Sequence, residues 1–442
     1  MSTLAELLFS DGFQISGSDI KASAPTRALA EKGVSIHIGH DETGVEQADI
    51  VVMTAAVHED NPEIKIARKM NIPVIKRAEL LGQLMRFFYG IGIAGTHGKT
   101  TVTAMVGWML HRERMNSIVA VGGEFVDHIP LLPEGETRFF VAEADEYDRS
   151  FLRMHPCLSV VTSIEPEHLE CYGSYEILEN QFVEFANRTP FFGRQIVCID
   201  SPGIKKLIPR LQGPLTTYGL SDKADIQGII KGDRKFEVRQ QGRRLGDARI
   251  LLPGTHNLLN SLATISIGLE LGVEFYAITN ALNQFRGVKR RLELRSRLDM
   301  NLGRKKVRDL LLVDDYAHHP TEVKAGLTAL SSTYRRRIVL IFQPHLYSRT
   351  QQFSKEFAKS FLAADIAIIS KIFPAREKPI PGISGEMLAE LSQEMGHQNV
   401  YFAEDFDQIM TLLEEVALKN DIIVTMGAGD INQIIDRLEG KR

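Results

Sequence analysis

Apolar and polar positions alternate along this chain on two length scales. Short runs such as Ile91 to Ala94 and Leu310 to Val313 have the length of a buried β-strand and are bounded by polar residues or glycine. Between such runs lie longer stretches whose apolar residues recur with helical spacing. Strand-length and helix-length segments follow each other nearly throughout, which predicts parallel sheets covered by helices on both faces. The chain is therefore expected to be an α/β protein.

The alternation divides into three regions. The first ends near residue 87, in a short stretch from Glu79 to Phe88 that leads into the apolar run before Gly95, where the second begins. A fresh alternation of strands and helices starts at residue 294. We therefore expect three domains, at residues 1–87, 88–293 and 294–442, which agrees with a length of 442 residues.

The predicted elements have ordinary lengths. In chain order they are a helix at 3–8, strands at 13–17 and 49–54, a helix at 100–111, strands at 139–142 and 158–164, a helix at 260–271, a strand at 307–313, a helix at 322–331, strands at 337–342, 366–370 and 399–403, a helix at 404–418 and a strand at 421–426. The stretch 223–250 is polar, basic and short-stranded, and we expect it to form a small antiparallel insertion.

The segment after residue 94 has the pattern of a phosphate-binding loop. It consists of Gly95, Thr96, His97, Gly98, Lys99, Thr100 and Thr101. A strand that turns through glycines into a helix directs backbone N–H groups and the positive end of the helix dipole at one place, where an anion binds. Lys99 would add a charge for the β- and γ-phosphates, and the hydroxyl of Thr100 or Thr101 could bind Mg²⁺. The first glycine of the general pattern is replaced by Ile93, so this is a shortened form; an ordinary glycine turn is the alternative.

Two acidic segments follow predicted strands of the central region. One is Glu143 to Asp148, and the other is Glu165 to His168. Open parallel sheets bind ligands at the carboxyl ends of their strands, so both segments could meet at the phosphate loop. A carboxylate and an imidazole there would suit Mg²⁺ that bridges ATP to a second substrate, although imidazole is not the usual ligand of so hard a metal. The alternative is that the acidic segments are solvated loops.

Polar residues also follow strands of the third region. Residues 314–320 contain the adjacent His318 and His319, and residues 343–350 contain Arg349. Adjacent histidines suggest zinc, but no third ligand stands at a characteristic spacing, so we do not expect a zinc site. The Arg349 guanidinium suits a bidentate contact with a carboxylate or a phosphate. These strand ends predict one ligand cleft between the second and third domains.

Composition narrows the function classes. Apolar residues make up 44% of the chain and charged residues 24%, as in soluble globular proteins, and the net charge of −4 gives no reason to expect a nucleic-acid partner. No apolar run is long enough for a membrane span, and no leader precedes the first helix. The three cysteines, Cys157, Cys171 and Cys198, lack C-x-x-C spacing, which favours reduced thiols in a cytoplasmic protein.

The motifs resemble those of the Mur ligase family, ATP-dependent amide-forming enzymes of peptidoglycan precursor synthesis. The resemblance covers nearly the whole chain and rests on the loop at Gly95 and on residues 143–151, 253–260, 314–320 and 342–350. It implies a Rossmann-like N-terminal domain that binds UDP, a central P-loop ATPase domain and a Rossmann-like C-terminal domain that brings the amino acid. Within the family, the segments are most similar to those of the members that join L-alanine to UDP-N-acetylmuramate. In that reaction the lactyl carboxylate takes the γ-phosphoryl group of ATP, and the alanine amine then displaces phosphate from the acyl phosphate.

The resemblance also implies roles for individual residues. Lys99, Glu143, His168 and Arg349 would act in catalysis, and Thr100, Glu143 and His168 would hold Mg²⁺. The adenine side would be formed by His256, Asn257 and Asn260, and Arg291 and Asp314 would reach the nucleotide when the C-terminal domain closes. The two substrates would contact Ser18, Asp19, Arg77, Tyr316, His318, His319, His345 and Arg349.

The chain departs from the family pattern in four places. Relatives have a strand and a glycine-rich loop before the helix at 3–8, and because that strand is central in a doubly wound sheet, its neighbours are expected to lack a partner. We therefore expect the natural start to lie upstream of Met1. The sugar-side loop after Gly123 is altered, Glu167 stands where aspartate is usual, and Leu346 stands where arginine is frequent.

Three alternatives remain open at this point. The first is a recycling ligase that joins a murein tripeptide to the same UDP-sugar; it shares the ATP loop, but residues 342–350 favour the alanine reaction. The second is a nicotinamide oxidoreductase, which the Lys99 loop and the missing glycine fingerprint oppose. The third is a UDP-sugar binder without activity. We expect a monomer or homodimer with no membrane partner.

Overall fold

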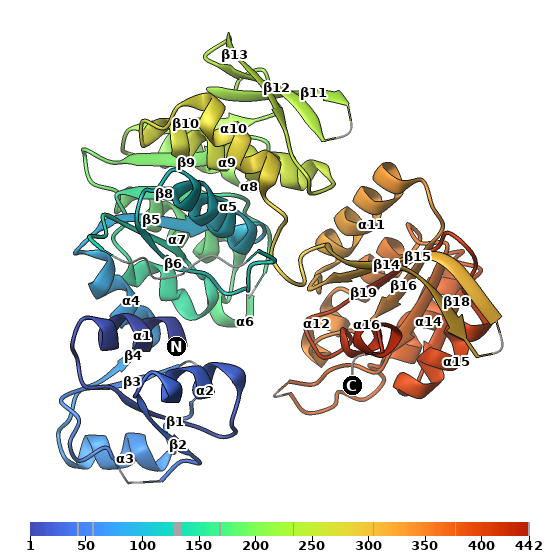
Figure 1. The fold of residues 1–442 in the computed structure, drawn as a ribbon, viewed down its shortest axis with the longest axis horizontal. Helices are drawn as coiled ribbons and strands as arrows, with labels where there is room; N and C mark the ends of the chain where they lie inside the picture. The colour runs from blue at the N-terminus through green and yellow to red at the C-terminus, as the bar shows by residue number, and fades with distance from the viewer. Residues whose placement is uncertain are drawn as a thin grey trace.

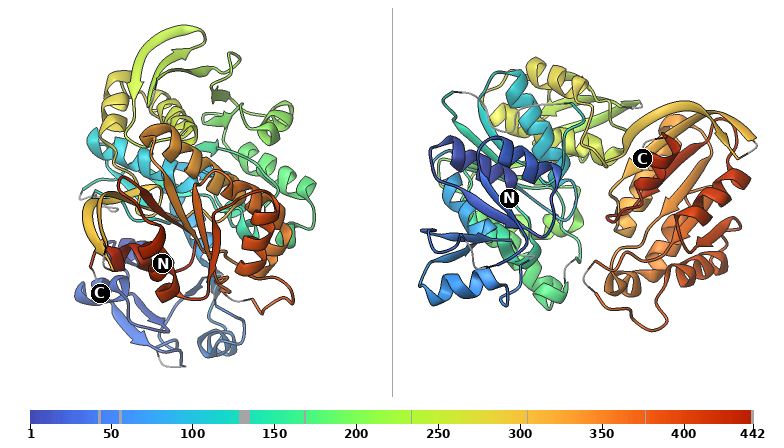
Figure 2. Two further views of the ribbon diagram at one scale, coloured as in Figure 1. Left: turned by 90° about the vertical axis from the view of Figure 1, so that its right-hand side faces the viewer. Right: turned by 60° about the horizontal axis from the view of Figure 1, so that its bottom comes forward.

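The computed structural model describes residues 1–41, 44–54, 57–127, 135–167, 169–232, 234–303, 305–375 and 377–440. Its elements fall into an N-terminal segment, a central unit built on a nine-stranded sheet and a C-terminal unit built on a six-stranded sheet (Figure 1). The C-terminal unit lies beside the central unit in Figure 1 and in the right view of Figure 2, and the segment after helix α10 (Phe275–Gln284) joins them. Strands and helices alternate in each part, so the α/β class is confirmed.

The N-terminal segment contains two separate small sheets. Its elements are α1 (Ser2–Ser10), β1 (Ser16–Asp19), α2 (Ala24–Glu31), β2 (Ser35–Ile38), β3 (Val51–Met53), α3 (Pro62–Lys69), β4 (Val74–Lys76) and α4 (Arg77–Met85). Strand β1 pairs in parallel with β2, and β3 pairs with β4, but the described residues contain no strand that joins the two pairs. The expected gap in the sheet is therefore present. Leu4 and Leu7 of α1 are buried in the same hydrophobic cluster as the core of the central unit.

The central unit is a mixed sheet in the order β13-β12-β11-β10-β9-β8-β5-β7-β6. Its elements are β5 (Tyr89–Ala94), α5 (Lys99–Arg112), β6 (Ser117–Ala120), β7 (Phe139–Glu143), the 3₁₀-helix η1 (Tyr147–Arg153), β8 (Leu158–Val161), α6 (Leu169–Tyr172), α7 (Tyr175–Asn187), β9 (Arg194–Cys198), α8 (Pro202–Leu207), η2 (Ile208–Arg210), β10 (Leu215–Gly219), β11 (Ile226–Gly232), β12 (Lys235–Gln240), β13 (Arg243–Arg249), α9 (Thr255–Glu270) and α10. The basic stretch 223–250 is antiparallel as predicted, but it is not a separate insertion, because β11 pairs with β10 and extends the main sheet.

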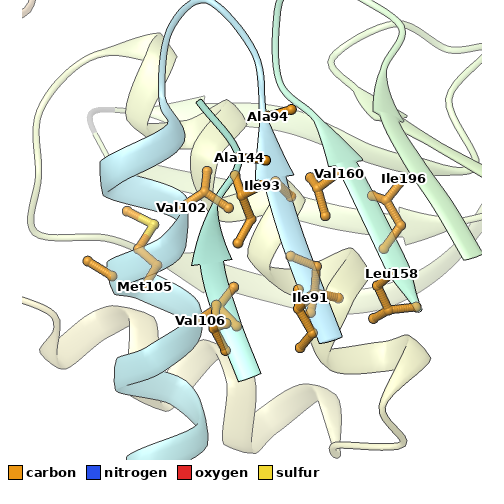
Figure 3. Packing of buried hydrophobic residues seen from close by; sticks show 14 of the residues in the cluster. Ile91, Ile93, Ala94, Val102, Met105, Val106, Ala144, Leu158, Val160 and Ile196 are labelled. Atoms are coloured by element: carbon orange, nitrogen blue, oxygen red, sulfur yellow. The ribbon is translucent and has the colours of Figure 1, made fainter. Parts of the chain in front are cut away.

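Strand β5 is central to this sheet, between β7 and β8. Its residues Ile91 and Ile93 are fully buried, and Val102 and Val106 of α5 pack over the same sheet (Figure 3). Helices cover both faces of such a strand, which explains its uninterrupted apolar sequence. The buried strand fixes the position of the loop that follows Ala94.

The C-terminal unit has the strand order β14-β15-β19-β16-β17-β18. Its elements are β14 (Glu293–Leu302), β15 (Lys305–Asp315), α11 (Pro320–Tyr334), β16 (Ile338–Phe342), α12 (Tyr347–Gln352), α13 (Ser354–Phe361), β17 (Ile366–Ser370), α14 (Gly385–Glu394), β18 (Val400–Ala403), α15 (Phe406–Val416), β19 (Ile422–Met426) and α16 (Gln433–Leu438). All neighbouring strands are parallel except β14 and β15. The sequence did not indicate β14, because most of its side chains are partly or fully exposed at the sheet edge. Among the described helices, none is long and apolar enough to cross a membrane.

Candidate active site

The phosphate loop connects the buried end of β5 to the first turn of α5. Gly95 has φ of 133° and Gly98 has φ of 87°, a region of backbone conformation that favours glycine. A Cβ atom at Gly98 would lie 2.5 Å from Oδ1 of Asn260, and one at Gly95 would collide with the Thr162 hydroxyl. Both glycines are therefore required by backbone geometry and by close packing. The predicted strand-turn-helix context of the loop is confirmed.

Lys99 is held at the base of this loop by a buried carboxylate. Its Nζ donates to both carboxylate oxygens of Glu146, at 2.9 and 2.7 Å, and to the Gly95 carbonyl at 2.7 Å. Burial alone would lower the pKa of Lys99, but the charges of Glu146 and Asp145 outweigh it and raise the pKa. Lys99 therefore stays positively charged.

Glu143 lies next to the loop at the end of β7. Its Oε1 accepts a hydrogen bond from the Gly122 backbone N–H at 2.8 Å. Burial raises the pKa of Glu143, while the Gly122 hydrogen bond and Arg291 oppose that rise. Arg291 Nη2 also lies 3.4 Å from the Thr100 hydroxyl. A partly buried carboxylate and a threonine hydroxyl thus stand together beside a positive charge.

The loop lines a cavity together with residues of the C-terminal unit. The cavity has a volume of about 110 Å³. Its lining consists of residues 96–101 of the loop, Glu167 from the end of β8, Arg291 from the linker, and His318 and Glu322 at the start of α11. The predicted cleft between the second and third regions is therefore present.

Four predicted residues of the C-terminal unit form one connected cluster. The rings of Tyr316 and His318 are 5.3 Å apart, and those of His318 and His345 are 6.0 Å apart. His345 Nδ1 lies 3.5 Å from Nη1 of Arg349, whose Nη2 donates to Glu167 at 3.5 Å. Burial lowers the pKa of His318 to about 3 and that of His345 to about 4, so both rings are neutral. This cluster thus offers neutral imidazoles and one guanidinium to a ligand.

His319 lies apart from this cluster, next to the rings of His97 and Phe353. Its ring centroid is 5.4 Å from that of His97 and 4.8 Å from that of Phe353. His97 Nδ1 pairs with Glu322 at 3.2 Å, and its Nε2 pairs with Glu165 at 3.4 Å. His97 therefore contacts carboxylates from both the central and the C-terminal unit.

A second cavity opens on the other side of Gly122. It has a volume of about 490 Å³ and is lined by residues 1–4 at the start of α1, Thr54, Arg77 and residues 120–122. The predicted substrate residue Arg77 is thus close to the N-terminus of a helix, a combination that favours anions. Gly122 links this second cavity to Glu143, because its N–H donates to the Glu143 carboxylate.

Comparisons with known proteins agree with this geometry over the full chain. Residues 1–89 match the family model described as "Mur ligase family, catalytic domain", residues 93–268 match "Mur ligase middle domain", and residues 296–429 match "Mur ligase, glutamate ligase domain". The chain belongs to the Mur ligase family.

Two curated relatives illustrate the match. The "UDP-N-acetylmuramate--L-alanine ligase" of Geotalea daltonii is 41% identical over 100% of this chain and 95% of its own length. The protein of the same name from Chlorobaculum tepidum is 43% identical over 99% of this chain and 92% of its own length. Among solved structures, the UDP-N-acetylmuramate-alanine ligase of Thermotoga maritima matches with a TM-score of 0.80 and 26% identity, over 100% of this chain and 96% of that chain.

The structure separates the predicted nucleotide residues into two groups. The loop residues and Arg291 line the small cavity, whereas His256, Asn257 and Asn260 of α9 do not. Asn257 and Asn260 are buried and hydrogen-bonded to each other at 3.2 Å, and Asn260 contacts the loop at Gly98. These asparagines therefore support the Mur ligase loop from behind.

Several predicted residues lie away from both cavities. Asp314 is fully buried, with its carboxylate against Arg290 at 3.4 Å and Thr425 at 2.8 Å. Ser18 and Asp19 are the last two residues of β1, and the Ser18 hydroxyl donates to Glu63 at 2.7 Å. His168 lies outside the described residues, as do residues 128–134 of the altered sugar-side loop.

Two carboxylates of the site, Glu146 and Glu322, were not predicted from the sequence as individual residues. Glu146 stood within an acidic segment that was noticed only as a whole, and Glu167 was noticed only as a departure from the family pattern. Glu322 had a local signal, because it is the third residue after His319 in a helix capping box, where its Oε2 accepts from the His319 backbone N–H at 3.3 Å. Its contact with His97 could be found only from the fold.

Sequence spacing offered no third zinc ligand beside His318 and His319, but the fold brings together a group of possible ligands that the spacing did not show. His97, Glu165 and His319 offer ligand atoms that all lie within 4.8 Å of one another, although they come from three distant segments. Burial would lower the pKa of His97, but Glu165 and Glu322 raise it to about 10. His97 is therefore protonated at neutral pH, which opposes metal binding because a ligating imidazole must be neutral.

Proposed function

We propose that this Mur ligase joins L-alanine to the lactyl carboxylate of UDP-N-acetylmuramate at the expense of ATP. The observation that carries the proposal is the small cavity, in which the phosphate loop of the central unit meets His318 and Glu322 of the C-terminal unit. An acid-activating group and an amine-side group thus line the same cavity. The shared name of the full-length relatives supports the same reaction.

The loop side would activate the acid. Backbone N–H groups of the loop and Lys99 stabilise negative charge on the transferring γ-phosphoryl group, and they are held in place before the reaction begins. The lactyl carboxylate attacks the γ-phosphorus, the bond to the β-phosphate oxygen breaks, and ADP leaves. The product is an acyl phosphate that must be protected from water, which closure of the two units over the cavity would provide.

The C-terminal side would bring the amine. Tyr316, His318, His345 and Arg349 surround the space next to the loop, and the Arg349 guanidinium suits the carboxylate of L-alanine. The amine attacks the acyl carbon, the bond to the phosphate oxygen breaks, and an amide and inorganic phosphate are formed. The ammonium protons pass to solvent or to a neighbouring base.

Magnesium fits the residues beside the loop. Glu143 and Thr100 supply hard oxygen ligands, and the pKa of Glu143 is raised by burial, so a cation next to it would relieve an unfavourable buried charge. We propose that Thr100 and Glu143 hold Mg²⁺ together with His168, and that the ion neutralises charge on the ATP phosphates.

The UDP-sugar would occupy the second cavity. Arg77 and the start of α1 favour its diphosphate, and Gly122 places this cavity next to Glu143, where the lactyl carboxylate must reach. Ser18 and Asp19 at the end of β1 remain proposed nucleoside contacts. His256, Asn257 and Asn260 remain proposed for the adenine side, with Asn260 supporting the loop.

We further propose the domain division predicted from the sequence, at residues 87 and 293. It is supported by the positions of β5, which starts at Tyr89, and of β14, which starts at Glu293. A cytoplasmic monomer or homodimer without nucleic-acid or membrane partners agrees with small-molecule substrates of this kind.

The proposal is tested by measuring phosphate release with ATP and Mg²⁺ while UDP-N-acetylmuramate and L-alanine are omitted in turn. We expect release to require both, and amide to form in equal amount. Release that is independent of both substrates would overturn the proposal. A competition between L-alanine and L-Ala-γ-D-Glu-diaminopimelate separates the alanine reaction from that of a recycling ligase.

A further inference from the structure

His97 occupies an unusual place for a residue of a phosphate loop. Its backbone faces the central unit, where the N–H donates to the Ser163 hydroxyl at 2.9 Å and the carbonyl accepts from Thr162. Its side chain points the other way, toward α11 of the C-terminal unit, and is mostly buried, with 19% exposed. The residue therefore spans the boundary between the two units.

Two carboxylates hold the His97 ring by its two nitrogens. Glu322 Oε1 lies 3.2 Å from Nδ1, and Glu165 Oε2 lies 3.4 Å from Nε2. The Glu322 contact is a hydrogen bond, whereas Glu165 lies at ion-pair distance without one. Only the charged imidazolium is attracted to both carboxylates, because a neutral ring carries a single N–H and no net charge. The Thr321 hydroxyl adds a further link, because it donates to Glu165 at 3.0 Å.

Glu322 carries this contact into the amine side of the site. While Oε1 binds His97, Oε2 accepts from the backbone N–H groups of His318 and His319, at 3.1 and 3.3 Å. These two residues form the turn before α11, and His318 lines the cavity. A single carboxylate thus joins the phosphate loop to the turn that presents the amine-side groups.

We propose that the His97 imidazolium is a positioning residue that ties the phosphate loop to the turn at His318 and His319. Charge on His97 holds Glu322, Glu322 fixes the turn, and the turn places the amine side over the acyl phosphate. The inference rests on the proposed ligase reaction and adds to it a coupling between its two halves. We call the contact of His97 with Glu165 and Glu322 the His97 clasp. Without it the acyl phosphate still forms, but attack by the amine is slower and a larger fraction of the acyl phosphate is hydrolysed.

The matched variants are His97→Asn and Glu322→Gln. Asn places an uncharged amide near the former Nδ1, and Gln still accepts the hydrogen bonds that cap α11, so both changes remove charge while keeping local geometry. We expect the KM for alanine to rise on the order of tenfold and the KM for ATP to stay within about twofold. We also expect more phosphate than amide to be released, whereas the wild type releases equal amounts.

Two comparisons distinguish this role from a structural one. In the double variant the loss should be no larger than in either single variant, because the two side chains act as one pair. Glu184→Gln is the control, since it removes an exposed helical ion pair with Arg188, and it should leave all these values unchanged. Thermal melting of each variant reports whether it is folded.

The outcomes separate the inference from the proposed function. A wild type that forms no amide would defeat the ligase proposal itself. If the wild type is coupled, unchanged alanine KM and equal phosphate and amide in both folded variants would overturn the clasp. Additive losses in the double variant would overturn it as well, because they would assign independent roles to the two residues.

Discussion

Lys99 is the residue on which we expect the phosphate chemistry to depend most directly, and Glu146 is its buried partner. Replacing Lys99 by Met should lower kcat/KM by about 10²- to 10³-fold, as loss of a preorganised charge at a reacting group does. The same change leaves the Glu146 carboxylate, which is 2% exposed, without its counter-charge. The free energy of unfolding should therefore fall by about 3–5 kcal/mol. Steady-state kinetics and urea unfolding measure the two effects.

A second substitution separates catalysis from stability at this pair. In Lys99→Met combined with Glu146→Gln, no buried charge remains unpaired, so stability should largely return while activity stays low. Recovery of activity together with stability would show that Lys99 serves the fold and not the phosphate.

Asp315 gives a prediction about pH, because burial raises its pKa from 3.8 to about 7. An acid whose pKa is higher in the folded state destabilises the fold increasingly as pH rises from 3.8 to about 7. Asp315→Asn keeps an oxygen that can accept from the Ala317 N–H, now at 3.3 Å. The variant should be more stable than the wild type by roughly 2–4 kcal/mol at pH 8, with the difference vanishing near pH 4. Urea unfolding of both proteins across this pH range measures the difference in the free energy of unfolding. A difference that grows toward low pH would contradict the prediction.

At the scale of elements, Arg290 attaches the linker between α10 and β14 to the carboxyl ends of strands β15 and β19 in the C-terminal sheet. This guanidinium donates to the carbonyls of Gly427 and Gly429, at 2.7 and 3.1 Å, and lies 3.4 Å from the buried Asp314. Arg290→Ala leaves Asp314 buried and unpaired, which should cost about 3–5 kcal/mol of unfolding free energy at pH 7. Differential scanning calorimetry or urea unfolding provides the measurement.

Arg297 is the matched control for Arg290. It pairs with Asp309 through Nε and Nη2, but its side chain is 63% exposed, and exposed pairs contribute little. Arg297→Ala should change stability by less than about 1 kcal/mol. Equal effects of the two substitutions would mean that Arg290 acts by surface charge alone and does not anchor the linker.

The same elements show what a sequence can predict and where it stops. The strand, glycine turn and helix around Lys99 were predictable because their signals are local: an apolar run, two glycines and a helical period. Strand β14 was missed because an exposed edge strand lacks that apolar signal. The contact of His97 with Glu322 joins residues 225 positions apart, and it depends on how two units pack, which no local pattern encodes.

At the scale of the whole molecule, the active site is a boundary between units. The cavity at the loop has about 110 Å³, whereas ligand pockets usually have about 300–1,000 Å³. We therefore expect a nucleotide to enter while the C-terminal unit is further from the loop, and closure to bring His318 and Glu322 to the phosphates afterwards. Besides the His97 clasp, the buried pair of Arg349 and Glu167 at 3.5 Å holds this closed form.

Closure should consequently depend on pH through His97. Four titratable side chains interact with its ring: Glu165 and Glu322 raise its pKa, whereas His319 and His256 are themselves neutral because burial lowers their pKa to about 4. The pKa of His97 is about 10 with these partners and 6.5 without them. The free energy by which charged His97 stabilises the contact between the two units is therefore fully present below pH 6.5 and is lost as the pH rises through about 10. Small-angle scattering should show the wild type expanding between pH 7 and pH 10. Glu322→Gln should already be expanded at pH 7 and change little, and a wild type whose radius of gyration stays constant over this range would refute the prediction.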